Sequence, residues 1–165
     1  EARSMEAWLK NDTSIQTITI SPDAIKKSEA LLCTAENEQL DWVGFGCPHF
    51  SYAEFTELVE CIADKKINSD IAFSVFTSRK ILRRVENTGI LDKLTNAGIE
   101  VYTDGCLLLY PQSLKPSGTM MTNSAKAANY IFSQAGYKVA YGSIRECVKS
   151  AVAGKIVRRR PLWLQ

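Results

Sequence analysis

The stretch of sequence that decides the fold is LDWVGFGCPHFSYAE, residues 40–54. Residues 42–46 form a short apolar run, which is typical of a buried β-strand. Ser51 stands three residues before Glu54, and this spacing predicts a capping box that opens a helix reaching about residue 64. A strand followed at once by a helix is the first half of a βαβ unit.

The chain downstream repeats this alternation of strand and helix. We expect strands at residues 71–76, 99–102 and 138–141, a short extended piece at 120–122, and helices at 79–96, 124–135 and 143–152. Gly89 predicts a break in the first of these helices, and Ser143 with Glu146 predicts a second capping box. Because strands separated by helices pair in parallel, the predicted fold is an α/β three-layer sandwich with a mostly parallel sheet of about four strands.

The N-terminal part of the chain has a different pattern. Residues 1–14 are mostly polar and predict a linker that ends in a short helix. Residues 15–20 alternate with period two, which predicts a half-buried strand. The serine and proline that follow predict the start of a helix that reaches about residue 34. We expect the α/β domain to span residues 15–154 and a basic C-terminal tail to occupy residues 155–165.

The composition is that of an ordinary globular domain. Of the 165 residues, 45% are hydrophobic and 23% are charged, and the formal net charge is +2. This near balance gives no strong attraction for nucleic acids or anionic membranes. No apolar run approaches the ~18 residues that cross a bilayer, and the first residues lack a signal-peptide pattern. We therefore expect a cytoplasmic protein without a nucleic-acid or membrane partner.

Chemically capable side chains follow each of the expected strands. They are Cys47, His49, Thr77, Ser78, Arg79, Asp104, Cys106, Asn123, Ser124, Lys126 and Ser143. In an open parallel sheet, ligands bind beyond the carboxyl ends of the strands. The sequence therefore predicts the functional site at this edge.

The five cysteines differ in their sequence context. Cys33, Cys61 and Cys147 fall inside expected helices, where a thiol usually serves as a small buried hydrophobe. Cys47 and Cys106 fall in loops at the carboxyl edge, which adjacent parallel strands can bring together. Two thiolates there can bind iron, or an iron–sulfur cluster completed from elsewhere. The alternative is that they are two unrelated loop cysteines.

The remaining edge residues also have more than one interpretation. His49 can be a metal ligand, an acid–base group or a residue that packs the loop. Arg79 and Lys126 stand at expected helix starts, where backbone N–H groups already favour anions, so they suit a carboxylate or phosphate. The alternative is that both are ordinary surface cations. Ser51 and Ser143 have the spacing of helix caps.

Several common templates are absent from the sequence. Gly44 and Gly46 begin like a dinucleotide-binding fingerprint, but His49 stands at the third glycine position. The sequence contains neither a P-loop nor the nucleophile elbow of α/β-hydrolases. These absences argue against the nucleotide-binding and hydrolase classes that rely on such motifs.

Five segments at the expected edge resemble a known family. They are GCPHFS at 46–51, TSR at 77–79, TDGC at 103–106, MTNSAK at 121–126 and YGS at 141–143. In their order and approximate spacing over residues 40–153, these segments resemble the aconitase X family. Many members carry serine at the position of Cys47 and threonine at that of Gly105, so the resemblance is more direct for Cys106.

The family consists of hydro-lyases related to aconitase, with a large catalytic part and a small swivelling part. Its members dehydrate cis-3-hydroxy-L-proline or mevalonate 5-phosphate and use iron, as an iron–sulfur cluster such as 2Fe–2S or as a simpler centre. The resemblance implies that this chain is the C-terminal third of the large catalytic part and has an aconitase-like fold. The implied partners are a small hydroxy acid, cis-3-hydroxy-L-proline first and mevalonate 5-phosphate next, and the remaining domains or the small swivelling subunit.

The resemblance also implies roles for individual residues. It implies iron binding by Cys106 and Cys47, catalytic roles for His49 and Ser124, and substrate binding by Ser51, Thr77, Ser78, Arg79, Asn123 and Lys126. The general base is either His49 or a residue outside this chain. Because further iron ligands would also lie outside it, we expect the isolated chain to be inactive. The alternative function is an α/β domain that binds a small anion, or only completes a larger structure, without activity of its own.

Overall fold

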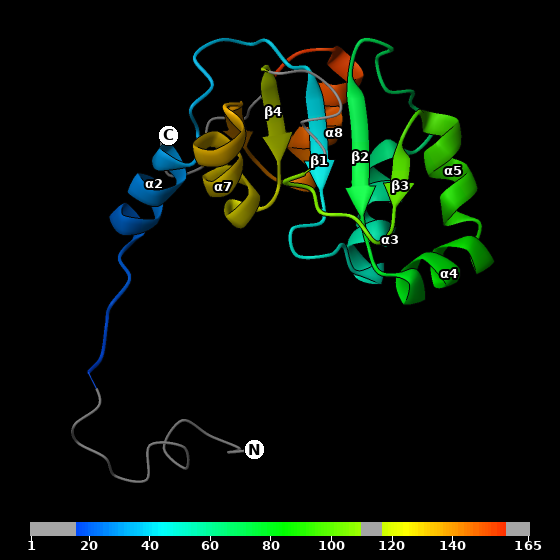
Figure 1. Ribbon diagram of the computed structural model, residues 1–165, viewed down its shortest axis with the longest axis horizontal. Helices are drawn as coiled ribbons and strands as arrows, with labels where there is room; N and C mark the ends of the chain where they lie inside the picture. Colours follow the sequence, from blue (N-terminus) through cyan, green and yellow to red (C-terminus); the bar gives the residue numbers. More distant parts are fainter. Residues whose placement is uncertain (1–15, 110–116, 158–165) are drawn as a thin grey trace, which may run out of the picture.

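The computed structural model describes residues 16–109 and 117–157, and Figure 1 shows their arrangement. The elements are, in chain order, α2 (Pro22–Leu31), β1 (Trp42–Phe45), α3 (Tyr52–Ile62), β2 (Ala72–Phe76), α4 (Arg79–Asn87), α5 (Ile90–Ala97), β3 (Glu100–Tyr102), β4 (Thr119–Thr122), α7 (Ala125–Ala135), β5 (Lys138–Tyr141) and α8 (Ile144–Ala153). None of the helices in these two ranges combines the length and the hydrophobicity that a membrane span requires.

The strands form one parallel sheet, which confirms the predicted α/β class. Its strand order is β3-β2-β1-β4-β5, so β1 lies at the centre between β2 and β4. The sequence predicted only a short extended piece near β4, but this strand pairs with both β1 and β5. The sheet therefore has five strands rather than about four. The strand is short and its centre is Met120 and Met121, which lack the β-branched side chains that usually mark a strand.

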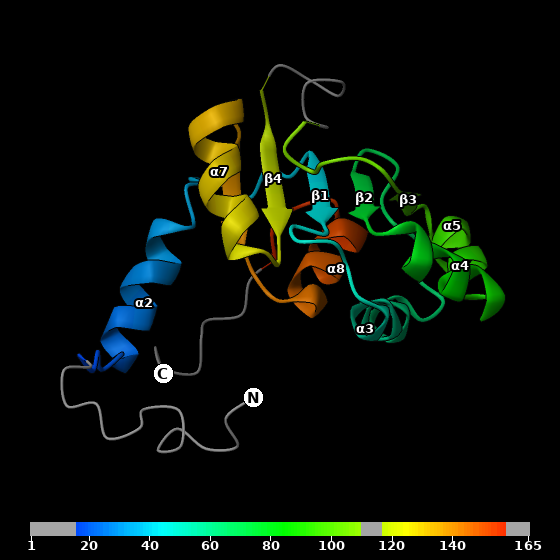
Figure 2. The same cartoon turned by 60° about the horizontal axis from the view of Figure 1, so that its bottom comes forward.

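Helices cover both faces of the sheet, as a three-layer sandwich requires. α3, α4, α5 and α8 lie on one face, α7 lies on the other, and α2 lies beside α7 (Figures 1 and 2). α3 contacts α8 on one side and α5 on the other, whereas α7 contacts β4 and β5. The expected helix at residues 79–96 is interrupted as predicted, since Gly89 has a φ of 68° and separates α4 from α5.

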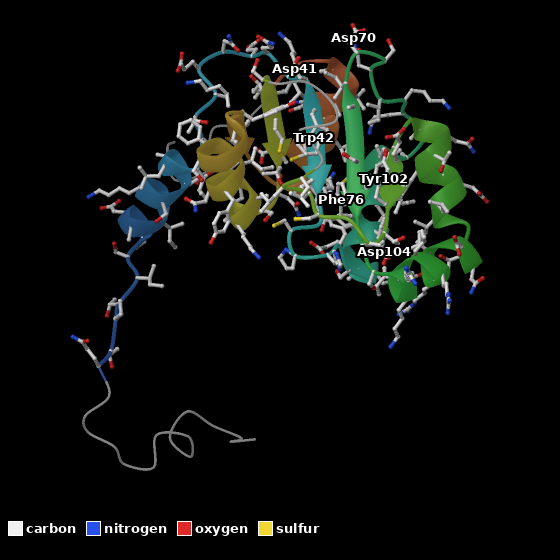
Figure 3. All side chains as sticks on the ribbon, in the orientation of Figure 1. Asp41, Trp42, Asp70, Phe76, Tyr102 and Asp104 are labelled. Atoms are coloured by element: carbon white, nitrogen blue, oxygen red, sulfur yellow. The ribbon has the colours of Figure 1, made fainter. Side chains whose placement is uncertain are left out.

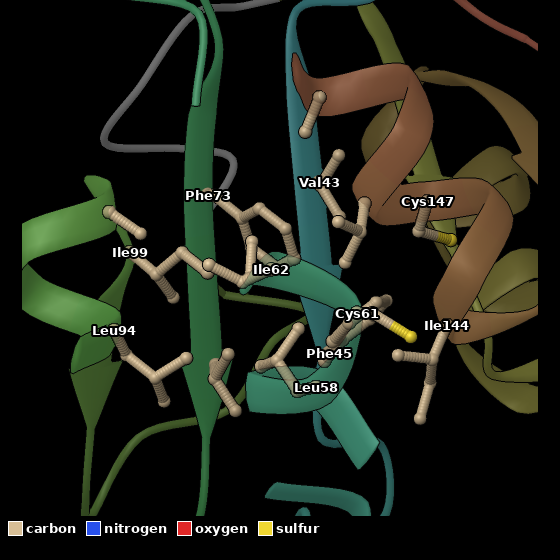
Figure 4. Packing of buried hydrophobic residues seen from close by; sticks show 14 of the residues in the cluster. Val43, Phe45, Leu58, Cys61, Ile62, Phe73, Leu94, Ile99, Ile144 and Cys147 are labelled. Atoms are coloured by element: carbon tan, nitrogen blue, oxygen red, sulfur yellow. The ribbon is translucent and has the colours of Figure 1, made fainter. Parts of the chain in front are cut away.

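Side chains of the central strands alternate between the two faces. Val43, Phe45 and Phe73 are buried on the side of α3 and α8, in the cluster that Figure 4 shows. Trp42 points to the opposite side, toward α7, where it is also buried. Its indole N–H donates to the buried hydroxyl of Ser74 at 2.6 Å, so its one polar group is satisfied away from water.

Of the three cysteines predicted to be buried within helices, two are buried there and one is not. Cys61 and Cys147 are buried in the larger core cluster. Cys33 is only half-buried, because α2 ends at Leu31 and leaves this residue beyond the helix. Its Sγ lies 3.4 Å from the backbone nitrogen of Tyr141 and 3.7 Å from the carbonyl oxygen of that residue. Cys33 therefore contacts the edge of β5, and the prediction of a buried helical position is wrong for it.

The strand predicted at residues 15–20 is wrong for residues 16–20, which have no regular structure. The side chains of Ile18 and Ile20 are 82% and 71% exposed. A strand needs a neighbour for its backbone groups, and one edge of the sheet, β5, is already occupied. There Thr34 and Ala35 donate their N–H groups to the carbonyl of Val139 at 2.8 and 3.0 Å.

Two predictions concern the ends of the chain. The expected linker and short helix at residues 1–14 lie outside the described residues, as do residues 158–165 of the expected tail. Ile156, just before them, is buried in the core and donates its N–H to the carbonyl of Glu38 at 2.8 Å. The domain ranges stay a prediction.

The loop that follows β1 depends on a glycine. Gly46 has a φ of 97°, and a Cβ built there would lie 2.0 Å from the carbonyl oxygen of Phe76. Two hydrogen bonds attach the loop to the end of β2. Phe50 donates its N–H to the carbonyl of Phe76 at 2.8 Å, and the Thr77 hydroxyl donates to the carbonyl of Phe50 at 2.7 Å. Glycine at position 46 is thus required by both backbone conformation and space.

We predict that Gly46→Ala lowers the free energy of unfolding by at least about 3 kcal/mol, since it adds a steric clash to an unfavourable φ. The matched control is Gly89→Ala, because Gly89 also has a positive φ but has no atom within 4 Å of the added Cβ. That variant should lose only about 1 kcal/mol. Urea unfolding followed by circular dichroism measures both values, and equal losses would contradict the role of the close contact.

Candidate functional site

The candidate site lies at the carboxyl ends of the strands, where four helices begin. Each of α3, α4, α7 and α8 starts at a serine N-cap, namely Ser51, Ser78, Ser124 and Ser143. The predicted capping boxes are both present, at Ser51 with Glu54 and at Ser143 with Glu146. Since the N-terminus of a helix carries a partial positive charge, this edge favours an anionic ligand.

A cavity of about 300 Å³ opens at this edge between the β1–α3 loop and the start of α7. Its lining residues are Gly46, Cys47, Pro48, His49, Glu54, Asn123, Ser124, Ala125 and Lys126. The structure thus brings together five of the residues that the sequence predicted for the site: Cys47, His49, Asn123, Ser124 and Lys126. Glu54 is a further lining residue, and the sequence analysis had assigned it only to helix capping.

Cys106 reaches the neighbourhood of Cys47 by a route that the sequence did not predict. Adjacent strands were expected to bring the two cysteines together, but β2 lies between β1 and β3. The loop after β3 instead runs back across β2 toward β1 (Figures 1 and 2). Gly105 lies against the Phe76 ring, and the buried Leu107 lies against Gly44. Cys106 itself is exposed.

The pKa of the Cys47 thiol is affected by the groups around it. Burial raises the pKa of the Cys47 thiol above its ordinary value. The ammonium group of Lys126 opposes this shift, the thiol of Cys106 adds to it, and a hydrogen bond with Ser124 opposes it. Burial, the largest effect, favours the neutral thiol. The ammonium group of Lys126 favours the thiolate and so reduces the shift.

Ser124 connects the start of α7 to the thiol-bearing loop. Its hydroxyl accepts the N–H of Ala127 at 3.0 Å and donates to the carbonyl of Cys47. Three residues predicted for substrate binding also make local hydrogen bonds. Ser51 and Ser78 cap α3 and α4, and Thr77 is buried with its hydroxyl bonded to Phe50. The catalytic role of Ser124 and the substrate roles of these residues stay predictions.

Arg79 lies outside the cavity lining, on the part of the edge that β2 and β3 provide. It is the first residue of α4, and its side chain is 73% exposed. Its Nε and Nη2 atoms both lie 2.7 Å from Oδ2 of Asp104. The sequence analysis placed Asp104 at the edge but gave it no role, because nothing in the sequence shows that its loop faces Arg79.

The side chains of the site include donors of the type that binds iron, but too few of them for a complete ligand set. Cys47 and Cys106 offer two thiols, and thiolates are the ligands of iron–sulfur clusters. In residues 16–109 and 117–157, no group of three or more His, Cys, Asp or Glu side chains is arranged to hold a metal ion. The two thiols are therefore donors of a suitable kind but, among the described residues, not a complete set of ligands.

Known proteins resemble this chain in sequence and in fold. The family model for the aconitase X third domain matches residues 40–153. A cis-3-hydroxy-L-proline dehydratase of Pseudomonas aeruginosa is 30% identical over 151 residues, which cover 90% of this chain and 26% of that protein. A phosphomevalonate dehydratase large subunit of Methanocaldococcus jannaschii is 33% identical over 135 residues, covering 82% of this chain and 33% of the relative.

The structural comparison agrees with the sequence comparison. The crystal structure of Thermococcus kodakaraensis aconitase X in its holo-form superposes with a TM-score of 0.72 and 20% sequence identity, covering 86% of this chain and 36% of that one. At this identity the likeness shows the fold. The chain spans about a quarter to a third of the length of the relatives it matches. These findings confirm the resemblance seen in the edge segments, and the chain belongs to the aconitase X family, whose third domain it contains.

Proposed function

We propose that this chain is part of an iron-dependent hydro-lyase that dehydrates a small hydroxy acid, and that it provides one wall of the active site. The observation that carries the proposal is the cavity at the carboxyl edge, which Cys47, His49 and Lys126 line together. The relatives named as dehydratases support the reaction class. Because the chain spans only part of their length, the activity would belong to a longer protein.

We propose that Cys106, together with Cys47, supplies part of the ligand set for iron or an iron–sulfur cluster. The remaining ligands would come from residues outside this chain. When bound, the iron would act as a Lewis acid that polarises the hydroxyl group of the substrate.

The cations of the edge would bind the acidic part of the substrate. Lys126 lies in the first turn of α7 and lines the cavity, so its ammonium group and the N-terminus of the helix attract the same anion. Asn123 can donate its amide N–H to a carboxylate oxygen from the same wall. Arg79 at the start of α4 would bind a second anionic group or the far end of the substrate.

His49 is the acid–base candidate within this chain. It is exposed and lines the cavity next to Cys47, and an imidazole can hold or release a proton near neutral pH. A base from outside the chain remains the alternative. For the substrate we propose cis-3-hydroxy-L-proline first and mevalonate 5-phosphate second, since relatives bear the names of both dehydratases. Both compounds carry the carboxylate that Lys126 would attract.

The full-length protein, purified without oxygen, should dehydrate one of these two compounds. Cys106→Ser should lower both its iron content and its activity, the latter at least about a hundredfold, because the iron loses a thiolate ligand. Elemental analysis and the rate of product formation measure the two effects. Cys61→Ala, which removes a buried thiol in the last turn of α3, is the control and should keep both. An iron-free enzyme with full activity would refute the proposal.

Lys126→Met should raise the KM for the hydroxy acid by about tenfold, because a charge-assisted contact with the carboxylate is lost. The matched control is Lys149→Met, which removes an exposed lysine within α8. Steady-state kinetics on the full-length enzyme give both values. If the two variants have the same KM as the wild type, Lys126 does not bind the substrate.

In the metal-free protein at pH 8, iodoacetamide should alkylate Cys47 more slowly than Cys106. Burial raises the pKa of Cys47, so less of it is thiolate, whereas Cys106 is exposed. Lys126→Met should slow the reaction of Cys47 further, since the ammonium group that lowers its pKa is removed. Peptide mass spectrometry at several times measures the rates. Faster alkylation of Cys47 than of Cys106 would contradict this assignment.

A further inference from the structure

Arg79 and Asp104 form a pair with a defined orientation. Nε and Nη2 of the guanidinium both lie 2.7 Å from the same carboxylate oxygen, Oδ2. These two nitrogens form one edge of the planar group, the edge nearest the side-chain stem. The other edge, formed by Nη1 and Nη2, also carries two parallel N–H donors. The contact with Asp104 therefore occupies one edge of the guanidinium and leaves the other for a second partner.

The loop around Asp104 is packed against the end of β2. Before it, the Tyr102 ring stacks on the Phe76 ring at 5.4 Å between centroids. After it, Gly105 lies against the Phe76 ring, and Leu107 is buried. Asp104 itself has a φ of 58°, a conformation that aspartate adopts more readily than most residues. Figure 3 shows it on the α4 side of Phe76 and Tyr102.

Stability alone does not account for this pair. Its side chains are 73% and 57% exposed, and ion pairs of such exposure contribute little to the free energy of folding. What the pair determines is direction, because two contacts along one edge restrict the rotation of the guanidinium. A free arginine side chain would have to lose that rotational freedom each time it bound a ligand.

We propose that Asp104 is a positioning residue, which orients Arg79 so that its Nη1–Nη2 edge receives an anionic group of the substrate. This is the second anionic group where the substrate has one, as mevalonate 5-phosphate does, and otherwise the carboxylate that Lys126 also attracts. The inference rests on the proposed hydroxy-acid dehydratase function. A carboxylate fits this edge through two parallel N–H donors. Asp104 is two residues from Cys106 in the same loop. Asp104 thus acts on the substrate through Arg79.

Kinetics of the full-length enzyme on cis-3-hydroxy-L-proline or mevalonate 5-phosphate, whichever it dehydrates, test the proposal. Asp104→Asn should raise KM roughly tenfold with kcat changed less than about threefold, because binding loses an oriented contact. Asp104→Glu should recover part of the loss. In an Arg79→Gln background, Asp104→Asn should have no further effect on KM, as expected for a residue that acts through Arg79. Additive effects of the two substitutions would overturn the proposal, and so would a lower KM for Asp104→Asn, which would make Asp104 a competitor of the substrate.

A matched control and a second readout separate this inference from the proposed function. Glu38→Gln removes the carboxylate of another exposed pair, with Lys155 at 2.7 Å, and should leave KM unchanged. The rate at which p-hydroxyphenylglyoxal modifies Arg79, measured by peptide mass spectrometry, should rise at least about threefold in Asp104→Asn and stay unchanged in Glu38→Gln. An enzyme without dehydratase activity that still shows this rise would refute the proposed function but not the pairing. An active enzyme in which Asp104→Asn changes neither KM nor the modification rate would refute the role of Asp104.

Discussion

The backbone and ring of Phe76, at the end of β2, support two loops of the functional edge. Its carbonyl accepts the N–H of Phe50 at 2.8 Å, and Gly46 passes so close that any Cβ there would lie 2.0 Å from the same oxygen. Its ring lies against Gly105, in the loop that follows β3. Both thiol-bearing loops are therefore positioned by one residue of a neighbouring strand. A change that moved the end of β2 would displace them together.

Much of the fold could be predicted because its signals are local. Ser51 with Glu54, and the left-handed Gly89, each specify a helix boundary within a few residues of sequence. The errors arose where the outcome depends on distant partners. Residues 16–20 have the alternation of a strand, but strand formation requires a free sheet edge, and Thr34 and Ala35 already contact the edge of β5. β4 was underestimated because its pairing with two neighbours is visible only in three dimensions.

The site was predictable in its location but not in its internal contacts. The rule that ligands bind beyond the carboxyl ends of parallel strands identified the lining residues Cys47, His49 and Lys126. The same rule says nothing about loops that cross a strand, so the approach of Cys106 to Cys47 over β2 could not be derived. The pair between Arg79 and Asp104 was equally hidden, since it joins a helix start to a loop 25 residues later in the chain.

The contact of residues 34 and 35 with β5 has a consequence for solubility and assembly. An uncovered edge strand presents free N–H and C=O groups that recruit strands from other molecules. Here Val139 accepts two backbone N–H groups and donates its own N–H to the Thr34 hydroxyl at 2.9 Å, so this side of the sheet offers few groups for pairing. The opposite edge, β3, is only three residues long and carries the exposed Glu100. Both borders of the sheet thus discourage strand exchange, which lets the domain lie beside other polypeptide segments without merging its sheet with theirs.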